Sequence, residues 1–201
     1  AMGVAVVSVI MVYAELNKRL RHALQKANRE LEYLSSHDEL TNLHNRRFYE
    51  QRMSQALKRA EEQGRPLGLL VFDLDEFKEI NDTHGHGMGD ALLIKLGERL
   101  RAQVRGIDLV ARLGGDEFAV IMENLRSVED MPLIAAKLIA AIKQPMTLRN
   151  TQFSLGVSCG VAVYPADGAT QRQLEEKADR AMYRAKQMNS TAPEPAPAML
   201  H

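Results

Sequence analysis

The stretch LVARLGGDEFAVIM, residues 109–122, decides the fold. Apolar residues on both sides of Gly114-Gly115 predict two short strands, Leu109–Arg112 and Phe118–Met122. A glycine pair between two such runs suits a tight hairpin, because glycine adopts positive φ without a steric penalty. The two residues that follow the glycines are both acidic. The hairpin therefore carries a pair of carboxylates at its turn.

A second pair of carboxylates follows the apolar run Leu67–Phe72, which is short enough to be a buried strand. Asp73 and Asp75 are two residues apart, so on a strand they point to the same face. We expect the hairpin to pair beside this strand and to bring Asp116 and Glu117 toward Asp73. Converging carboxylates repel one another unless a cation neutralises them. Hard oxygen ligands favour Mg²⁺ or Mn²⁺ over zinc, although the Asp-x-Asp pair alone is equally typical of solvated loop carboxylates.

The rest of the chain alternates helical and strand-like patterns. Ser35, Ser36 and Asp38 are expected to interrupt one helix and to cap the next. Further helices are predicted at Asn45–Gln63, Ala91–Val104, Val128–Lys143 and Gln171–Met188, a small hairpin at Pro145–Phe153 and a strand at Val157–Tyr164. The core order β-α-β-β-α-β predicts an α+β fold, a ferredoxin-like palm with helices flanking an antiparallel sheet.

The predicted domain organisation is a stalk helix over residues 1–36, a catalytic domain over 37–190 and a disordered Pro/Ala-rich tail over 191–201. The chain opens with about a dozen apolar residues, fewer than the roughly 20 of a complete transmembrane helix. We expect the end of a membrane span there, with a helix buried in a dimer as the alternative. Apolar residues then recur every three or four positions, and this seam predicts pairing with a second copy; its members are Tyr13, Leu16, Leu20, Leu24, Ala27, Leu31 and Leu34.

Composition narrows the class of protein. The 201 residues include 26 basic and 26 acidic side chains, 45% hydrophobic residues, no Trp and one cysteine, Cys159. These values are typical of a globular domain and argue against disorder, a disulfide scaffold or a general nucleic-acid binder. A single cysteine within an apolar strand indicates an unreactive core thiol in a reducing compartment.

Several motifs occur in one order along the chain, and together they resemble the GGDEF family of diguanylate cyclases from Asp38 to about Lys186. The motifs are DELTNL at 38–43 with NRR at 45–47, then FDLDEFKEIND, GHGMGD, RLGGDEF and ADRAMYRAK. The resemblance implies the nucleotidyl-cyclase form of the palm. It also implies an enzyme that condenses two GTP molecules into cyclic di-GMP and two pyrophosphates across a homodimer.

The resemblance assigns the metal and the chemistry to a few residues. Two Mg²⁺ or Mn²⁺ ions per GTP half-site would be held by Asp73, the Leu74 carbonyl, Asp116 and Glu117. Asp116 would also accept the proton of the attacking 3′-hydroxyl. Lys78 would stabilise charge on the transferred phosphoryl group, so the expected catalytic residues are Asp116, Glu117 and Lys78.

The resemblance also assigns the nucleotide contacts. Asn81, His86 and Asp90 would contact the guanine and ribose, while His84 and His86 alone would otherwise suggest zinc. The phosphates would be bound by the backbone at Glu76 and Phe77 and by Lys78 and Lys186. Arg105 and Asp108 match the RxxD product-inhibition site of the family, with a structural ion pair as the alternative. The family's Gly-Arg-Asn does not follow Lys186, so we expect a weaker hold on the triphosphate.

Two other functions compete with the diguanylate cyclase hypothesis. One is a catalytically weak GGDEF domain that acts as a receptor for cyclic di-GMP or GTP. The other is an adenylyl cyclase, which Asn81 and Asp90 disfavour because they match guanine. For either GGDEF hypothesis we expect a cytoplasmic domain tethered to the inner membrane, with a membrane or sensor domain upstream and no nucleic-acid partner.

Overall fold

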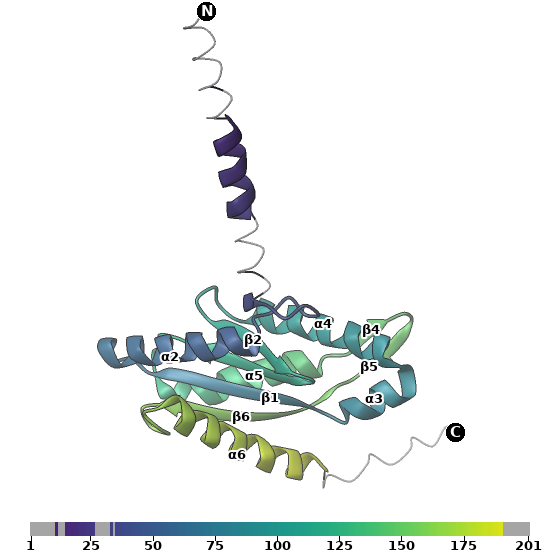
Figure 1. Ribbon diagram of the computed structural model, residues 1–201. Helices are drawn as coiled ribbons and strands as arrows, with labels where there is room; N and C mark the ends of the chain where they lie inside the picture. Colours follow the sequence, from purple (N-terminus) through teal and green to yellow (C-terminus); the bar gives the residue numbers. More distant parts are fainter. Residues whose placement is uncertain (1–10, 12–14, 27–32, 34, 191–201) are drawn as a thin grey trace, which may run out of the picture.

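The computed structural model describes residues 11, 15–26, 33 and 35–190 (Figure 1). Its centre is a four-stranded sheet in the order β2-β3-β1-β6, in which all neighbours are antiparallel. The strands are β1 (Leu67–Asp75), β2 (Leu109–Gly114), β3 (Glu117–Met122) and β6 (Gly156–Tyr164). This order confirms the predicted α+β fold, because a ferredoxin-like palm pairs its β2-β3 hairpin with the central first strand.

Helices cover both faces of the sheet (Figure 1). One face carries α2 (Arg46–Gln63) and α6 (Gln171–Ser190), and the other carries α4 (His86–Gln103) and α5 (Met131–Lys143). The remaining elements are short: α3 (Phe77–His84), η1 (Val128–Asp130), β4 (Met146–Leu148) and β5 (Thr151–Phe153). The predicted small hairpin is therefore present as β4 and β5, which pair with each other outside the main sheet.

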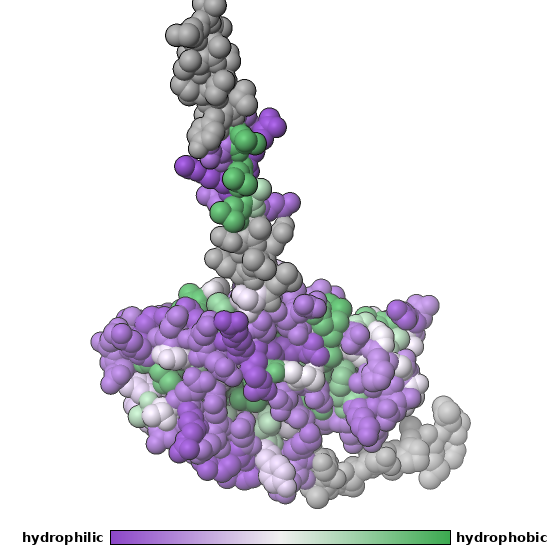
Figure 2. Space-filling model, viewed as in Figure 1, coloured by the Kyte–Doolittle hydropathy of each residue, from purple (hydrophilic) through white to green (hydrophobic). Residues whose placement is uncertain are grey.

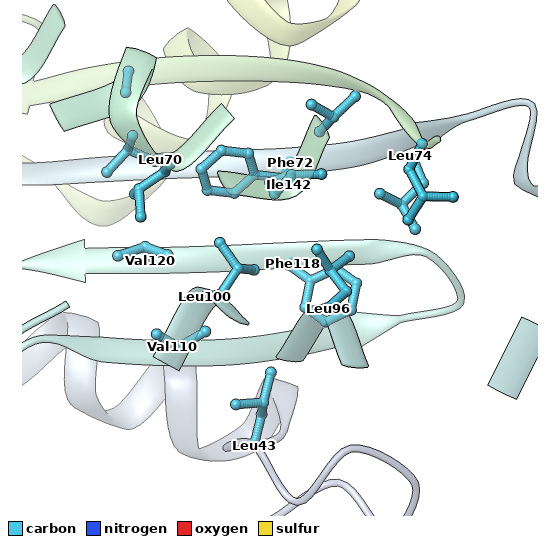
Figure 3. Close-up of a cluster of buried hydrophobic side chains, with 14 of the residues drawn as sticks. Leu43, Leu70, Phe72, Leu74, Leu96, Leu100, Val110, Phe118, Val120 and Ile142 are labelled. Atoms are coloured by element: carbon cyan, nitrogen blue, oxygen red, sulfur yellow. The ribbon is translucent and has the colours of Figure 1, made fainter. Parts of the chain in front are cut away.

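Strand β1 is buried on both faces because its side chains alternate between two hydrophobic clusters. Leu70, Phe72 and Leu74 belong to the cluster under α4 and α5, which Figure 3 shows. Leu69 and Val71 belong to the cluster under α2 and α6. A strand that is buried on both faces has consecutive apolar residues in its sequence, and for this reason β1 could be predicted from the sequence.

The only cysteine, on β6, packs against the first of these clusters. Burial raises the pKa of the Cys159 thiol to about 12, so the thiolate is scarce at neutral pH. This position is consistent with the predicted core thiol, whose lack of reactivity stays a prediction.

Helix α2 starts within one residue of the predicted Asn45, but its cap differs from the prediction. Asn45 caps this helix, and its side chain accepts a hydrogen bond from the Phe48 backbone at 3.0 Å. The expectation that Ser35, Ser36 or Asp38 would cap it was wrong. The Asp38 carboxylate instead accepts the backbone N–H of Thr41 at 2.9 Å and closes a separate turn, which is common for an aspartate outside a helix.

Helix α4 begins at His86, earlier than the predicted Ala91. Gly85 adopts a φ of 81° between α3 and α4 and lets the chain change direction within one residue. The glycine-rich start of α4 lacks the leucine periodicity on which the sequence prediction depended.

Residues 15–26 form a helix that stands away from the domain (Figure 1). Leu16, Leu20 and Leu24 are 63%, 66% and 61% exposed. Figure 2 shows hydrophobic side chains gathered along this helix beside hydrophilic ones. The other predicted seam residues lie outside the described residues, as do most of the apolar opening and the predicted tail. Among the helices of the described residues, none is long and apolar enough to cross a bilayer.

Gly160 on β6 permits the close approach of α6 to the sheet. A Cβ atom added there would collide with the Ala178 carbonyl and lie 2.8 Å from the backbone nitrogen of Met182. Because both neighbours are backbone atoms of one helix, they cannot move aside as a side chain would. The small residue therefore sets the height of α6 above β6.

We predict that Gly160→Ala lowers the free energy of unfolding by about 1–3 kcal/mol, since it overpacks a rigid contact. Gly106→Ala is the matched control, because nothing lies within 4 Å of an added Cβ at that position. Its effect is expected to stay within about 0.5 kcal/mol. Urea unfolding of the two variants and the wild type measures both values. Equal stability of all three proteins would contradict this account of the contact.

Candidate active site

Asp73 and Glu117 lie opposite each other on the two central strands of the sheet, near the end of β1 and the start of β3. They are register partners between β1 and β3, and Ser158 of β6 lies on the other side of Asp73. Directly paired residues on antiparallel strands have Cβ atoms about 4.5–5.5 Å apart. The predicted approach of the hairpin to the first core strand is therefore confirmed, and two of the expected metal ligands lie side by side.

Asp116 occupies the turn of the hairpin. Gly114 and Gly115 have φ values of 146° and 53°, which explains why the turn needs two glycines. Burial raises the pKa of Asp116 above its ordinary value. The nearby Asp73 carboxylate adds to this rise, while the cations Lys186 and Arg112 oppose it. The turn thus holds an acidic group in a partly desolvated position beside another acid.

Arg112 attaches this hairpin to the turn that precedes α2. Its Nη1 atom donates to Asp38 Oδ1 and Oδ2 at 3.0 and 3.2 Å, and its Nε atom donates to the Gly115 carbonyl at 2.9 Å. Burial tends to raise the pKa of Asp38, but hydrogen bonds from Thr41 and Arg112 hold it below its ordinary value. The ionised pair therefore anchors the glycine turn.

Arg46, the first residue of α2, holds the hairpin at a second point. Its Nε atom donates to the Leu113 carbonyl at 2.9 Å, and its Nη2 atom lies 3.4 Å from Glu117 Oε2. The sequence predicted no role for Arg46 or Arg112 and only a helix cap for Asp38, although all three lie within the quoted motifs. In the sequence these residues appear only as charged side chains next to glycines or a helix start. Such a position does not reveal which distant residue each side chain contacts.

Lys186 reaches the carboxylates from α6. Its Nζ atom donates to Asp73 Oδ1 at 2.5 Å. That hydrogen bond raises the pKa of Lys186, and the charges of Asp116 and Asp75 raise it further. Asp75 is held separately, because its Oδ1 atom accepts the hydroxyl of the fully buried Ser158 at 2.7 Å. An ammonium group thus lies among three aspartates at the end of β1.

The donor set suits a hard divalent cation. Carboxylate oxygens of Asp73, Asp116 and Glu117 and a strand-end carbonyl are ligands that Mg²⁺ and Mn²⁺ accept. The presence of the Lys186 ammonium beside Asp73 shows that this position favours positive charge. Within residues 11, 15–26, 33 and 35–190, no three His, Cys, Asp or Glu side chains already converge as a metal centre. The donor types of these described residues match a hard divalent cation, but their positions do not form a ready-made centre.

The expected phosphate-binding backbone follows the carboxylates directly. Glu76 adopts the left-handed conformation with a φ of 58° and turns the chain from β1 into α3. Phe77 is buried and anchors the helix, whereas Lys78 is exposed. The N-terminus of α3 is therefore placed beside the carboxylates, where free backbone N–H groups attract anions.

The expected guanine-binding residues lie at the corner between α3 and α4. Asn81 packs against Gly89, where an added Cβ would lie 3.0 Å from its Cγ atom. Asp90 is the next residue, and it is exposed, as is His86 at the start of α4. The ring of His84 packs instead on the edge of Phe153, with centroids 5.1 Å apart. Asn81 of α3 thus contacts α4 at Gly89, the residue before Asp90.

Arg105 and Asp108 lie at the opposite end of β2 from the glycine turn. The Asp108 carboxylate accepts from Arg105 Nε at 2.8 Å and Nη2 at 2.7 Å, and from the Glu123 backbone at 3.3 Å. Its side chain has no exposed surface, whereas that of Arg105 is half exposed. A cavity of about 260 Å³ adjoins this pair, with Arg126 and Lys137 in its wall.

Comparisons with known proteins agree with this geometry. The profile of the family described as "Diguanylate cyclase, GGDEF domain" matches residues 35–191. The chain is 42% identical over 189 residues to the bifunctional diguanylate cyclase/cyclic di-GMP phosphodiesterase MucR of Pseudomonas aeruginosa, which covers 90% of this chain and 27% of MucR. It is 45% identical over 164 residues to the diguanylate cyclase TpbB of the same species, which covers 81% of this chain and 38% of TpbB. The chain therefore spans less than half the length of these relatives.

Solved structures give the same result. The structure of a TpbB mutant that comprises only the GGDEF domain has a TM-score of 0.73 at 46% identity, and the match covers 76% of this chain and 89% of that one. The coiled coil and GGDEF domain of DgcB from Caulobacter crescentus, in complex with c-di-GMP, has a TM-score of 0.74 at 28% identity, covering 90% and 94% of the two chains. With its carboxylates, glycine turn and α3 start in place, this chain belongs to the GGDEF domain family of diguanylate cyclases.

Proposed function

We propose that this protein is a diguanylate cyclase that condenses two GTP molecules into cyclic di-GMP. Each protomer of a homodimer presents one GTP, and the 3′-oxygen of each nucleotide attacks the α-phosphorus of the other. Two P–O bonds form, two break, and two pyrophosphates leave. The observation that carries the proposal is the placement of Asp73, Asp116 and Glu117 beside the start of α3 in a chain of this family.

The side chains at the end of β1 would hold the metal and move the proton. Asp73, the Leu74 carbonyl, Asp116 and Glu117 would hold Mg²⁺ or Mn²⁺, which neutralises negative charge on phosphate oxygens when bound. Asp116 is proposed to accept the proton of the 3′-hydroxyl. Its partly buried position in the glycine turn limits the water that would compete for that proton.

The phosphates would lie over the start of α3. The backbone at Glu76 and Phe77 offers N–H groups, and Lys78 and Lys186 supply ammonium groups from two different helices. The triphosphate would thus contact positive charges from both α3 and α6. Because the family's arginine does not follow Lys186, α6 supplies one cation fewer than the family pattern.

The corner between α3 and α4 would bind the base. An amide at Asn81 and a carboxylate at Asp90 can pair with the guanine edge, because Asp accepts from N1–H and the exocyclic amine. His86 is exposed at the same corner and would contact the nucleotide. Adenine lacks that donor pattern, so it would leave the Asp90 carboxylate without a partner.

Product binding is proposed at Arg105 and Asp108. Asp108 is fully engaged with Arg105 and the Glu123 backbone, so a guanine could reach it only if the Arg105 side chain moved. The half-exposed Arg105, together with Arg126 and Lys137 around the adjoining cavity, offers positive charge to the phosphates of a cyclic dinucleotide.

We predict that Asp116→Asn lowers the rate of cyclic di-GMP formation at least about a hundredfold, since it removes the proposed base and a metal ligand. Asp82→Asn, the same change at an exposed position of α3, is expected to stay within about twofold of the wild type. Product chromatography after incubation with GTP and Mg²⁺ measures both. An Asp116→Asn enzyme within tenfold of the wild type would refute the assignment, and a wild type without turnover would favour a receptor.

We predict that Asp90→Ala weakens GTP binding about ten- to a hundredfold, because a hydrogen bond to a charged group contributes about 1.5–3 kcal/mol. Binding of ATP should change less than about threefold. Glu98→Ala, which removes another exposed carboxylate of α4, serves as the control. Calorimetric titration with both nucleotides distinguishes the outcomes. Equal losses for GTP and ATP would indicate that Asp90 is structural.

The stalk is proposed to form the dimer. Leu16, Leu20 and Leu24 follow one another at four-residue steps on a helix that has no core of its own in one protomer. Leucines exposed in this way are stabilised when two copies pair, and the pairing would hold two GTP-bound half-sites near each other.

We predict that Leu20→Asp weakens dimerisation about a hundredfold or more, since each of the two buried leucines contributes about 1.5–3 kcal/mol. Specific activity should then fall at low enzyme concentration and recover as the concentration rises. Leu133→Asp, at a 76% exposed position of α5, is the control. Sedimentation velocity together with activity against concentration tests this. An unchanged dimer in Leu20→Asp would exclude the stalk as the dimer contact.

A further inference from the structure

The Lys186 ammonium group occupies a position among the carboxylates that are expected to bind metal. Its Nζ atom lies 2.5 Å from Asp73 Oδ1, and the Asp73 side chain is only 15% exposed. Asp75 and Asp116 are close enough to act on the same ammonium electrostatically. The contact joins residues that are 113 positions apart in the sequence. It exists because α6 packs directly on β6 and β1, with Gly160 allowing the approach.

Several carboxylates gathered in one place require a positive charge. Without one, like charges disfavour ionisation and raise the pKa values of the group. The Lys186 ammonium meets this need directly, because its Nζ atom lies 2.5 Å from Asp73 Oδ1. Lys186 therefore performs, in the protein alone, the electrostatic task that a divalent cation performs in a loaded centre.

We propose that Lys186 is the resident counter-ion of the metal-free centre, and that metal binding displaces its ammonium group toward the triphosphate. The inference rests on the proposed function, since it requires that Asp73 and Asp116 bind metal. The long, flexible stem of lysine permits such a change of partner without movement of the helix. Lys186 is then a positioning residue with two anionic partners, the Asp73 carboxylate and the phosphates.

The exchange couples the two ligands. A metal that enters alone must break the contact between Lys186 and Asp73, which weakens its apparent affinity. When GTP is also present, the released ammonium gains the phosphates as a partner, so this loss is compensated. By linkage, the nucleotide and the metal then each increase the affinity of the centre for the other. Lys186 would thus offset part of the negative charge of the centre until substrate and metal are both available.

Mn²⁺ binding to the full chain without nucleotide tests the proposal, with free Mn²⁺ measured by electron paramagnetic resonance. Lys186→Gln and Lys186→Met should bind Mn²⁺ about three- to tenfold more tightly than the wild type, because the competing cation is gone. Lys186→Arg keeps the charge and should remain near the wild-type affinity. Lys177→Gln is the matched control, since it removes a lysine of α6 that pairs with Asp167 at 2.8 Å, away from the carboxylates.

The outcomes separate this inference from the proposed function. Asp116→Asn should abolish Mn²⁺ binding; if it does so while both neutral Lys186 variants bind Mn²⁺ as the wild type does, or more weakly, the counter-ion role is wrong and the metal centre stands. If Asp116→Asn binds Mn²⁺ normally, or if neither the wild type nor the neutral Lys186 variants bind any, the metal centre itself is wrong and the inference falls with it. Thermal unfolding in EDTA confirms that each variant is folded, and the two neutral replacements guard against failure of one.

Discussion

The register between β1 and β3 is the constraint on which the rest of the structure depends. In this register Phe72 pairs with Phe118 and the next residue, Asp73, pairs with Glu117. A slip of one residue would send each side chain of the shifted strand to the opposite face, where it would meet the packing of the other hydrophobic cluster, and would separate the two carboxylates. The burial of β1 on both faces therefore fixes the positions of acidic side chains that contribute nothing to the core. Stability of the sheet and geometry of the site are consequences of one pairing.

A glycine turn is too flexible to hold Asp116 by itself, and arginines supply the rigidity. Arg112 ties the turn to Asp38, and Arg46 ties it to the N-terminus of α2. Both contacts reach toward the segment that connects the stalk with the domain. The acidic turn is thus positioned by the segment around Asp38 and Arg46, through one ion pair and one hydrogen bond to a backbone carbonyl.

Much of the fold could be predicted because its strands are buried and its motifs are local. The apolar run of β1 and the glycine pair of the hairpin each predict their element within a few residues. The cap of α2 was missed because the Asp38 carboxylate closes a turn of its own with the Thr41 backbone, and the start of α4 was missed because it depends on the positive φ of Gly85. The metal and nucleotide residues were named by motif resemblance, and the structure brings Asp73, Asp116 and Glu117 together while leaving their roles to experiment.

Periodicity and short motifs are local properties, so the family, the order of strands and helices, and the residue types that suit a metal and a guanine nucleotide could all be inferred from the amino-acid sequence. Only the tertiary structure decided which charges meet. Lys186 with Asp73, Arg46 with the hairpin and Arg112 with Asp38 are pairs between residues distant in sequence. The sequence does not show which residue a charged side chain pairs with, since many opposite charges are available along the chain. The choice is made when the helices pack on the sheet and bring one of them within hydrogen-bond distance.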